Sequence, residues 1–347
     1  MISVIIPIFN EQKFISRAIE SVLCQDIKNT YQEIIIVDGM STDGTRGIIN
    51  GFKRKHKNII LLDNPGKLVS IGFNKALTIS KGDIIFRLDG HAEFRSDYFR
   101  KCIAIMKEKD INCVGGVIIH HSYGIIGKTI QISQSSTFGV GGVDFRKTNT
   151  RAKFVDTLAF GAYDRKLFEN FGGYDEDLVK NQDDELNFRI IQNGEKIWLD
   201  PTLKTIYHSR NNFKDLLSQY FFYGFYKIRV IQKRKGFASW RHLIPAVFLI
   251  SLLVSVWIKV KFSESVPIYS LIIMYTFCNV VSVVLELLRN FKKFIPLGEF
   301  VSILLLPISF LIMHLSYGAG FIAGSIFFLN LWKNNYLNDK HYFKKIK

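Results

Sequence analysis

The stretch SVIIPIFNE at residues 3–11 decides the fold, because a run of β-branched and apolar residues ends there in polar side chains. Three more runs of strand length follow, at 33–38 (EIIIVD), 59–62 (IILL) and 84–88 (IIFRL). Stretches with a helical spacing of apolar residues separate the four runs, at 11–25, 43–55 and 70–80. Strands this apolar, alternating with helices, predict a parallel sheet covered on both faces. The expected fold class for residues 1–90 is therefore an open α/β sandwich.

In open α/β sheets, ligands bind beyond the carboxyl ends of the strands. That rule selects three segments that follow their strands directly, at 7–11, 38–45 and 89–93. The pattern is less regular from 91 to 226, where we expect a helix at 96–109, a strand at 113–119 and a helix near 183–193. A stretch rich in Gly, Ser and Thr near 133–150 suggests that this part is a mobile region on the substrate side.

The charge of the chain is concentrated in its last third. Of a net charge of +16, residues 1–226 carry +4 and residues 227–347 carry +12, beside the long apolar runs. Basic residues next to apolar segments are typical of the cytoplasmic side of a membrane and attract anionic lipid, so nucleic acid is not an expected partner. The four cysteines include no CxxC pair, which argues against a zinc site or a disulfide framework. The N-terminus reads as a strand and not as a signal peptide.

The apolar runs predict a membrane region at 243–332. Uncharged runs cover 243–258, 266–285 and 300–332, and roughly 17–25 apolar residues suffice for one crossing. The third run is too long for one helix, so we expect its middle, Ser316–Gly320, to divide it into two short helices. Four crossings place all three basic clusters inside, whereas three would leave the tail outside. The expected organisation is a catalytic domain at 1–226, a basic juxtamembrane segment at 227–242, about four membrane helices at 243–332 and a basic cytoplasmic tail at 333–347.

Two further motifs complete an ordered set. NQDDELNFR at 181–189 and QYFFYG at 219–224 follow the segments SVIIPIFNE, IIIVDGMSTDGT (34–45) and GDIIFRLDGH (82–91). Together they resemble the family 2 glycosyltransferases, specifically the membrane-associated type that builds bacterial exopolysaccharide or capsule. The resemblance implies a GT-A fold, a nucleotide-sugar donor, Mn²⁺ or Mg²⁺, inversion at the anomeric carbon and an acceptor linked to a polyprenyl carrier.

The resemblance assigns the donor side of the site to strand ends. Asp89 is the expected metal ligand, because a hard cation held by a carboxylate neutralises a diphosphate leaving group. His91 stands where the family usually has a second Asp, so it is either a borderline metal ligand or a hydrogen-bond donor to phosphate. The expected contacts with the nucleotide sugar are Pro7, Glu11, Asp38 and Lys67. Asp43 is equally plausible as a turn former and helix cap.

The resemblance assigns the acceptor side to the later motifs. Asp183 matches the family's catalytic base, with Glu185 as the later acid and Gln182 in place of an acid. Gln219 and Tyr220 are expected to face the acceptor, although tyrosines on a helix often serve only packing. His208 and Arg210 are weaker candidates for contact with the diphosphate. His314 lies within an apolar run, where it is either functional or a partner in a hydrogen bond between helices.

The expected function is an inverting glycosyltransferase that moves a sugar from a nucleotide diphosphate to a lipid-linked saccharide at the cell membrane, with the catalytic domain cytoplasmic. Two alternatives stay open. One is a glycosyltransferase that uses polyprenyl phosphate directly, and the other is a non-catalytic membrane protein that binds nucleotide sugar, since Gly39, His91 and Gln182 all depart from the family's pattern. A dehydrogenase is excluded because no GxGxxG follows the first strand.

Overall fold

The computed structural model describes all residues except 28–29, 148, 237–239, 291–296 and 334–347. The described chain forms two compact units. Of the described residues, the first unit contains 1–119 and 144–208, and the second contains 120–143 and 209–333. The domain boundary expected at 226 therefore falls inside the second unit.

The first unit is built on one mixed sheet with the strand order β3-β2-β1-β4-β8-β6-β9-β5, and β7 pairs with β9. The strands β1 to β4 run parallel, as predicted, and the pairs β4/β8, β6/β8, β5/β9 and β7/β9 are antiparallel. Their bounds are β1 Ile2–Ile8, β2 Gln32–Asp38, β3 Ile59–Asp63, β4 Ile84–Arg87, β5 Ala92–Phe94, β6 Cys113–His121, β7 Lys153–Phe154, β8 Gly161–Asp164 and β9 Ile197–His208.

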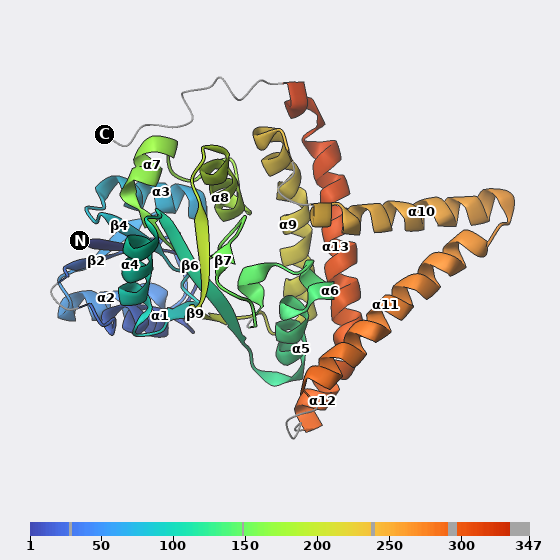
Figure 1. Ribbon diagram of the computed structural model, residues 1–347, viewed down its shortest axis with the longest axis horizontal. Coiled ribbons are helices and arrows are strands. Elements are labelled where there is room, and N and C mark those ends of the chain that lie inside the picture. Colours follow the sequence, from blue (N-terminus) through green and yellow to red (C-terminus); the bar gives the residue numbers. More distant parts are fainter. Residues whose placement is uncertain (28–29, 148, 237–239, 291–296, 334–347) are drawn as a thin grey trace. The chain divides into compact units, whose positions relative to one another are not determined.

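Helices flank this sheet (Figure 1). They are α1 Ile15–Leu23, α2 Thr45–Lys55, α3 Val69–Ile79, α4 Tyr98–Lys109, α7 Arg165–Phe171 and α8 Gln182–Gln192, with a short 3₁₀ turn at Asp144–Arg146. Every residue of β1 is buried, which is why that strand reads as a continuous apolar run and not as an alternating one. The open α/β fold expected from the sequence is confirmed, with antiparallel strands added on one side.

Because β2, β1 and β4 are neighbours and parallel, their carboxyl ends meet at one edge of the sheet. The segments after them are joined by backbone hydrogen bonds: Gly39 N donates to Ile8 O over 2.8 Å, and Leu88 N donates to Ile5 O over 3.1 Å. Glu11 N donates to Thr45 Oγ1 over 2.9 Å. The three segments that the sequence selected therefore lie side by side.

The second unit is helical. It contains α5 Gly124–Ser135, α6 Thr137–Val140, α9 Phe213–Arg234, α10 Ile244–Phe262, α11 Val266–Asn290, α12 Leu297–Leu304 and α13 Leu306–Phe327, with 3₁₀ turns at Trp240–His242 and Leu329–Lys333. The stretch near 133–150, expected to be irregular and mobile, begins within α5 and includes α6. The segment expected to lie between the catalytic domain and the membrane at 227–242 begins as the last two turns of α9, a single helix of 22 residues.

The helices α9 and α13 lie side by side at very short distance (Figure 1). Glycines make this approach possible, because a Cβ on Gly320 would collide with Phe221 O and a Cβ on Gly324 with Phe225 O. A Cβ on Gly224 of α9 would in turn collide with Tyr317 O. Small residues at such positions let two backbones touch.

The predicted division of 300–332 at Ser316–Gly320 is wrong, because α13 runs through these residues without a break. Their small side chains serve the contact with neighbouring helices and not a turn. The described residues hold three helices long and apolar enough to cross a membrane: Trp240–Phe262, Val266–Arg289 and Leu306–Phe327. The tail predicted at 333–347 lies almost entirely outside the described residues.

Candidate active site

The end of β4 carries an ion pair. Arg87, which is buried, donates from a guanidinium nitrogen to Asp89 Oδ1 over 2.7 Å and from the other to Ala159 O over 3.1 Å. Asp89 is only about one fifth exposed, with a side-chain accessibility of 21%. The guanidinium therefore holds the carboxylate of Asp89 in one orientation at the edge of the sheet. Sequence reasoning quoted Arg87 within its motif but gave it no role.

Asp183 lies in the first turn of α8, after Asn181, whose positive φ of 64° turns the chain into the helix. Its Oδ1 accepts a hydrogen bond of 2.9 Å from the backbone N–H of Asp184. Burial raises the pKa of Asp183; the positive charge of Arg87 opposes this, and the negative charges of Asp184 and Asp89 add to it. The structure thus brings Asp183 into the electrostatic field of Arg87 and Asp89, although about 90 residues of sequence separate them.

Glu11 and His91 form a second pair at the same edge. Glu11 Oε1 lies 2.7 Å from His91 Nδ1, and both side chains are less than one fifth exposed. Gly90 stands between the two loops, and a Cβ there would collide with Glu11 Cγ. The glycine of the DGH motif therefore lets Glu11 approach the end of β4. The contact with Glu11 uses Nδ1 of His91, and Nε2 lies on the opposite side of the ring.

Whether this edge suits a divalent cation depends on its donor atoms. The described residues contain no group of three or more His, Cys, Asp or Glu side chains arranged to hold a metal ion. Mg²⁺ is usually held by one or two carboxylates together with substrate phosphates, and not by a cage of protein ligands. A site of Asp89, with His91 beside it, fits that pattern. The second carboxylate oxygen of Asp89, Oδ2, makes no hydrogen bond with any residue that the structure describes.

Asp38 is fully buried at the end of β2 and already bonded. It accepts hydrogen bonds from Ser41 N over 3.1 Å and Ser41 Oγ over 2.5 Å, and it pairs with Arg46 over 2.7 Å. Arg46 also reaches Asp63, at the end of β3, over 2.8 Å. The structure thus places Asp38 in the support of the loop at 39–45. The neighbouring Asp43 forms a turn before α2 by accepting a hydrogen bond of 3.0 Å from Thr45 N, which is the turn-former alternative.

The two remaining donor-side candidates differ in exposure. Pro7 is buried within β1, opposite Val37 of β2. Lys67 has a positive φ of 57° in the loop before α3, and its Nζ lies 5.5 Å from the ring centre of Phe9, which is exposed. Phe9 and Lys67 are therefore both exposed, in the segments that follow β1 and β3.

His208 lies at the end of β9, near the same elements. Its Nε2 is 2.6 Å from Glu93 Oε1, and its ring stacks on Phe14 at 4.4 Å between centres. This pair ties β5 and β9 to the start of α1. Arg210 is exposed and belongs to the second unit.

The acceptor-side candidates Gln219 and Tyr220 lie on α9 in the second unit. Gln219 donates to the hydroxyl of Tyr223 over 2.9 Å and accepts from Gln134 over 3.3 Å. Tyr220 is buried against Ile130, Leu216 and Met313. In this unit they form hydrogen bonds and core contacts, so the packing alternative describes Tyr220 as the structure has it.

His314 joins three helices of the second unit. Its Nε2 lies 2.9 Å from Phe138 O, and its Nδ1 lies 2.9 Å from the hydroxyl of Tyr275. Since a carbonyl oxygen only accepts, Nε2 carries the proton and Nδ1 accepts from the tyrosine. The hydrogen bond between helices, one of the two alternatives for His314, is thus present.

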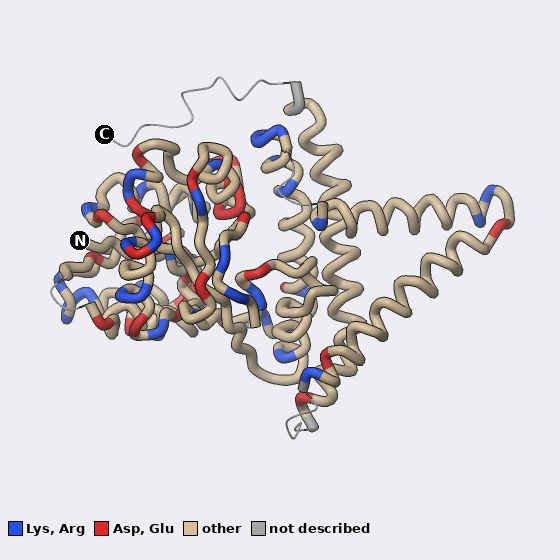
Figure 2. The backbone as a smooth tube through the Cα atoms, viewed as in Figure 1, with Lys and Arg blue, Asp and Glu red and all other residues tan. Residues whose placement is uncertain are grey.

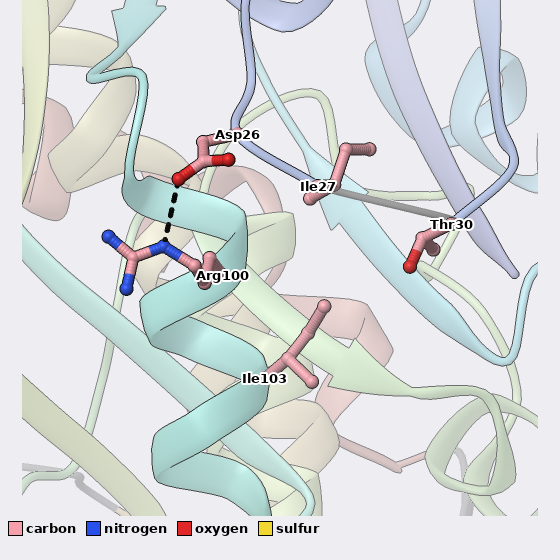
Figure 3. A pocket seen from close by; sticks show the side chains of 5 residues that line it. All are labelled: Asp26, Ile27, Thr30, Arg100 and Ile103. Carbon is pink, nitrogen blue, oxygen red and sulfur yellow. Dashed lines mark hydrogen bonds and ion pairs between the residues drawn. The ribbon is translucent and has the colours of Figure 1, made fainter.

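A pocket lies elsewhere in the first unit (Figure 3). It is lined by Asp26, Ile27, Thr30, Arg100 and Ile103, and Asp26 pairs with Arg100 over 3.2 Å. It borders the loop that leads into the amino end of β2, whereas the candidate site lies at the carboxyl ends. It is therefore separate from the site.

Comparison with known proteins identifies the family to which the chain belongs. A family model described as glycosyl transferase family 2 matches residues 3–172. The chain is 32% identical over 260 residues to a dolichyl N-acetyl-α-D-glucosaminyl phosphate 3-β-D-2,3-diacetamido-2,3-dideoxy-β-D-glucuronosyltransferase of Methanococcus voltae, a match that covers 73% of this chain and 80% of the relative. It is 27% identical over 244 residues to the succinoglycan biosynthesis protein ExoA of Rhizobium meliloti, covering 70% and 73%.

Among solved structures, the mannosyltransferase PcManGT from Pyrobaculum calidifontis, in complex with GDP-Man and Mn²⁺, has a TM-score of 0.58 at 15% identity, covering 93% of this chain and 86% of that one. That likeness shows the fold. The fold and the relatives together define a glycosyltransferase of GT-A type. More narrowly, the chain belongs to glycosyltransferase family 2, as the ordered motifs predicted.

Proposed function

We propose that this enzyme transfers one sugar, with inversion, from a nucleotide-diphosphate donor to a hydroxyl of a lipid-linked saccharide. The observation that carries the proposal is the position of Asp183, a carboxylate with a raised pKa in the same electrostatic neighbourhood as Arg87 and Asp89. An attacking hydroxyl needs a base on one side, and a departing diphosphate needs positive charge on the other.

In this proposal Asp183 is the general base. Its pKa is raised by burial, which makes it a better proton acceptor than an exposed aspartate. The helix start holds its backbone, and the N–H of Asp184 orients one oxygen, so the other oxygen is available to the acceptor hydroxyl. Glu185 has a different task, because it is fully buried and pairs with Arg189 over 2.8 Å.

The donor lies across the carboxyl ends of β1, β2 and β4 in this proposal. Asp89 and His91 would hold Mn²⁺ or Mg²⁺, which when bound neutralises charge on the diphosphate. Arg87 orients Asp89, and Glu11 orients His91. Lys67 and Phe9 provide a cation and an aromatic face at the same edge, and Asp38 with Arg46 fixes the loop 39–45 against the nucleotide. The mannosyltransferase that shares the fold was solved with GDP-Man and Mn²⁺, which supports a nucleotide sugar and a divalent cation.

The acceptor is proposed to be a saccharide on a polyprenyl carrier in the cell membrane. Support comes from the relative whose name describes transfer to a dolichyl-linked sugar phosphate, from the succinoglycan biosynthesis relative and from the three apolar helices. We further propose that the first unit faces the cytoplasm.

The test is a screen of radiolabelled nucleotide sugars with the full-length protein in membranes that contain lipid-linked oligosaccharides. We expect label in an organic extract, released by mild acid as a saccharide longer by one residue, and no label with Asp183→Asn. Asp97→Asn is the matched control and should keep full activity, because Asp97 is a half-buried aspartate that precedes α4 and pairs with Lys101. Label on polyprenyl phosphate alone would favour the direct lipid transferase. Nucleotide binding without transfer from any donor would favour the non-catalytic protein.

A further inference from the structure

The helices α10 and α11 form a hairpin with apolar side chains exposed over most of its surface. Its tip is the short turn at 263–265, and along their lengths the two helices are uncharged except for Lys259 and Lys261 near the tip and Glu286 and Arg289 near the base (Figure 2). The helices contain 19 and 25 residues, which at about 1.5 Å per residue gives roughly 28 and 37 Å. A hydrocarbon core of about 30 Å matches both lengths. Exposed members on α10 and α11 include Val247, Leu253, Trp257, Ile273, Phe277 and Leu288.

The third apolar helix, α13, has different surroundings. None of its residues from 312 to 325 is exposed. Its first half packs on α5, where Ser133 Oγ and Ser309 Oγ lie 2.7 Å apart. Its second half packs on α9 through Gly320 and Gly324. Because α13 packs on α5 and α9, it can cross the hydrocarbon core of a bilayer only if these two helices can enter the bilayer with it.

Neither neighbour can cross a bilayer. The helix α5 has 12 residues, or about 18 Å. In α9, the charges of Asp215 and Lys227 enclose 11 uncharged residues, or about 17 Å, roughly half of a hydrocarbon core. The turns beyond carry Lys227, Arg229 and Lys233, all buried.

These cations travel with α13, because the two helices stay in contact from Tyr220 and Met313 to Gln232, which donates to Phe328 O over 2.8 Å. If α13 crossed the membrane, it would also carry the start of α9, with Lys214 and Asp215, to the depth of its own middle, because Leu216 and Tyr220 pack with Met313. Charged side chains at such depth cost several kcal/mol each. The pair α9/α13 is therefore unsuited to span.

Geometry within the second unit supports the same conclusion. The first turn of α10 meets the middle of α13, where a Cβ on Gly318 would nearly touch Pro245 O. From that point α10 runs away from α13 at a steep angle (Figure 1). Two helices crossing in this way cannot both stand along the membrane normal. One of them must lie close to the membrane plane.

We infer that, among the helices that the structure describes, only α10 and α11 cross the membrane, as one hairpin, and that α9, α12 and α13 lie along the cytoplasmic interface. Phe300, Leu304, Ile308 and Leu311 are exposed at spacings of three and four residues, which forms a single apolar stripe along α12 and α13. A one-sided stripe is typical of a helix that lies in the interface, with a lipid bilayer as its partner. The base of the hairpin has more basic residues in sequence, at 233–241 and 289–293, than the tip, where Glu264 offsets one of two lysines.

The test is labelling of single-cysteine variants with a membrane-impermeant maleimide in intact cells and after permeabilisation. The background replaces the exposed Cys24 and Cys278 and keeps the buried Cys102 and Cys113. The labelled positions are Ser263→Cys at the tip, Gly298→Cys at the start of α12 and Asn330→Cys after α13. All three residues are exposed, and a Cβ on Gly298 meets no atom within 4 Å.

The expected result is labelling of Ser263→Cys in intact cells and of the other two variants only after permeabilisation. Labelling of Asn330→Cys in intact cells would mean that α13 crosses the membrane and would overturn the inference. Protection of Ser263→Cys in intact cells would mean that the hairpin does not cross. The topology is read without any assay of sugar transfer, so its failure is distinguishable from failure of the proposed function.

Discussion

Asp183 and Arg87 show how two residues far apart in sequence set each other's charge state. The pKa of Asp183 is raised by burial and by the carboxylates of Asp184 and Asp89, and the guanidinium of Arg87 limits the rise. The pKa of Arg87 is itself raised by Asp89, so the guanidinium stays charged at any working pH. A base that must be ionised to act then loses activity as the pH falls through its raised pKa.

This coupling predicts two opposite shifts in the pH profile of kcat. Asp184→Asn removes a like charge and should move the acid limb to lower pH, because the pKa of Asp183 falls. Arg87→Met removes the opposing charge and should move the limb to higher pH. Arg87→Lys keeps the charge and is the control. Shifts in the same direction for Asp184→Asn and Arg87→Met would contradict the assignment of the limb to Asp183.

Removal of Asp183 itself should be more severe than removal of its neighbour. Loss of a general base costs on the order of 10²–10⁴-fold in rate. We expect Asp183→Asn to bind donor normally and to lose turnover by about that factor, with Asp184→Asn far milder. Donor affinity from calorimetry and turnover from product formation separate the two effects. If Asp184→Asn proves inactive and Asp183→Asn active, the base is Asp184.

The metal prediction belongs to Asp89. Asp89→Asn keeps the shape and removes the charge that attracts a cation, so kcat should fall on the order of 100-fold or more. Addition of a chelator to the wild-type protein should lower activity, and Mn²⁺ or Mg²⁺ should restore it. Undiminished activity in chelator, or full activity of Asp89→Asn, would remove the metal from the mechanism.

At this scale, the sequence predicted that Glu11 and Asp89 follow strand ends and that Asp183 lies at a helix start, and the structure confirms these places in the fold. Sequence reasoning did not anticipate the contacts that occupy some of these residues. Asp38 stands at the expected place, yet Ser41 and Arg46 surround its carboxylate. Arg87 gained no role because its electrostatic influence on Asp183 arises only through the fold.

At the scale of elements, α9 and α13 depend on three glycines for their contact. Alanine at Gly320 would place a Cβ against Phe221 O, and the helices would have to separate. We expect Gly320→Ala to lower the free energy of unfolding by about 1–3 kcal/mol. The measurement is thermal unfolding of the purified protein in detergent.

Gly298→Ala is the matched control, because nothing lies within 4 Å of the added Cβ. In a helix, alanine is favoured over glycine by up to about 1 kcal/mol, so this variant should be neutral or slightly stabilised. Equal effects of the two substitutions would mean that the close contact contributes nothing to stability.

The same glycines explain why the predicted break in α13 was wrong. Ser316–Gly320 has low helix propensity, and on local grounds such a stretch favours a turn. Packing against α9 and the start of α10 stabilises the helical conformation despite the low helix propensity of these residues, so α13 continues without a break. The strands β1 to β4 were predictable because burial on both faces requires a continuous apolar run in the sequence. Contact between helices that are distant in sequence produces no such local pattern.

At the scale of the whole molecule, the second unit is built from two separate segments of the chain. The chain leaves the first unit at the end of β6, at residue 120, and returns to it at residue 144, where the 3₁₀ turn Asp144–Arg146 begins. Within that insertion Thr129 Oγ1 donates to Ser302 O over 2.9 Å, and Phe138 packs against Phe310 at 5.1 Å between ring centres. The boundary at 226 was drawn from charge and hydropathy, which do not reveal that an earlier segment packs with later helices.

A truncated chain ending at residue 208 should therefore aggregate, because the buried faces of α5 and α6 lose their partners. Replacement of 122–143 by a flexible Gly-Ser linker in the same fragment should restore a monomer. Size-exclusion chromatography of both fragments is the measurement. A monomeric fragment that still contains 122–143 would show that the insertion does not need the later helices.

The pairing of α9 with α13 also sets an order of events during synthesis. About 100 residues separate Phe225 from Gly324, the positions that meet. At roughly 5–20 residues per second, α9 leaves the ribosome some 5–20 s before its partner exists. Throughout that interval the face of α9 that contains Gly224 and Phe225 lacks the helix against which it packs. During the same interval the hairpin α10/α11 is synthesised and inserted. The second unit can therefore complete its packing only after α13 has been synthesised. A ribosome stalled before residue 324 would hold a nascent chain in which the sheet of the first unit is complete and the contact of α9 with α13 is not.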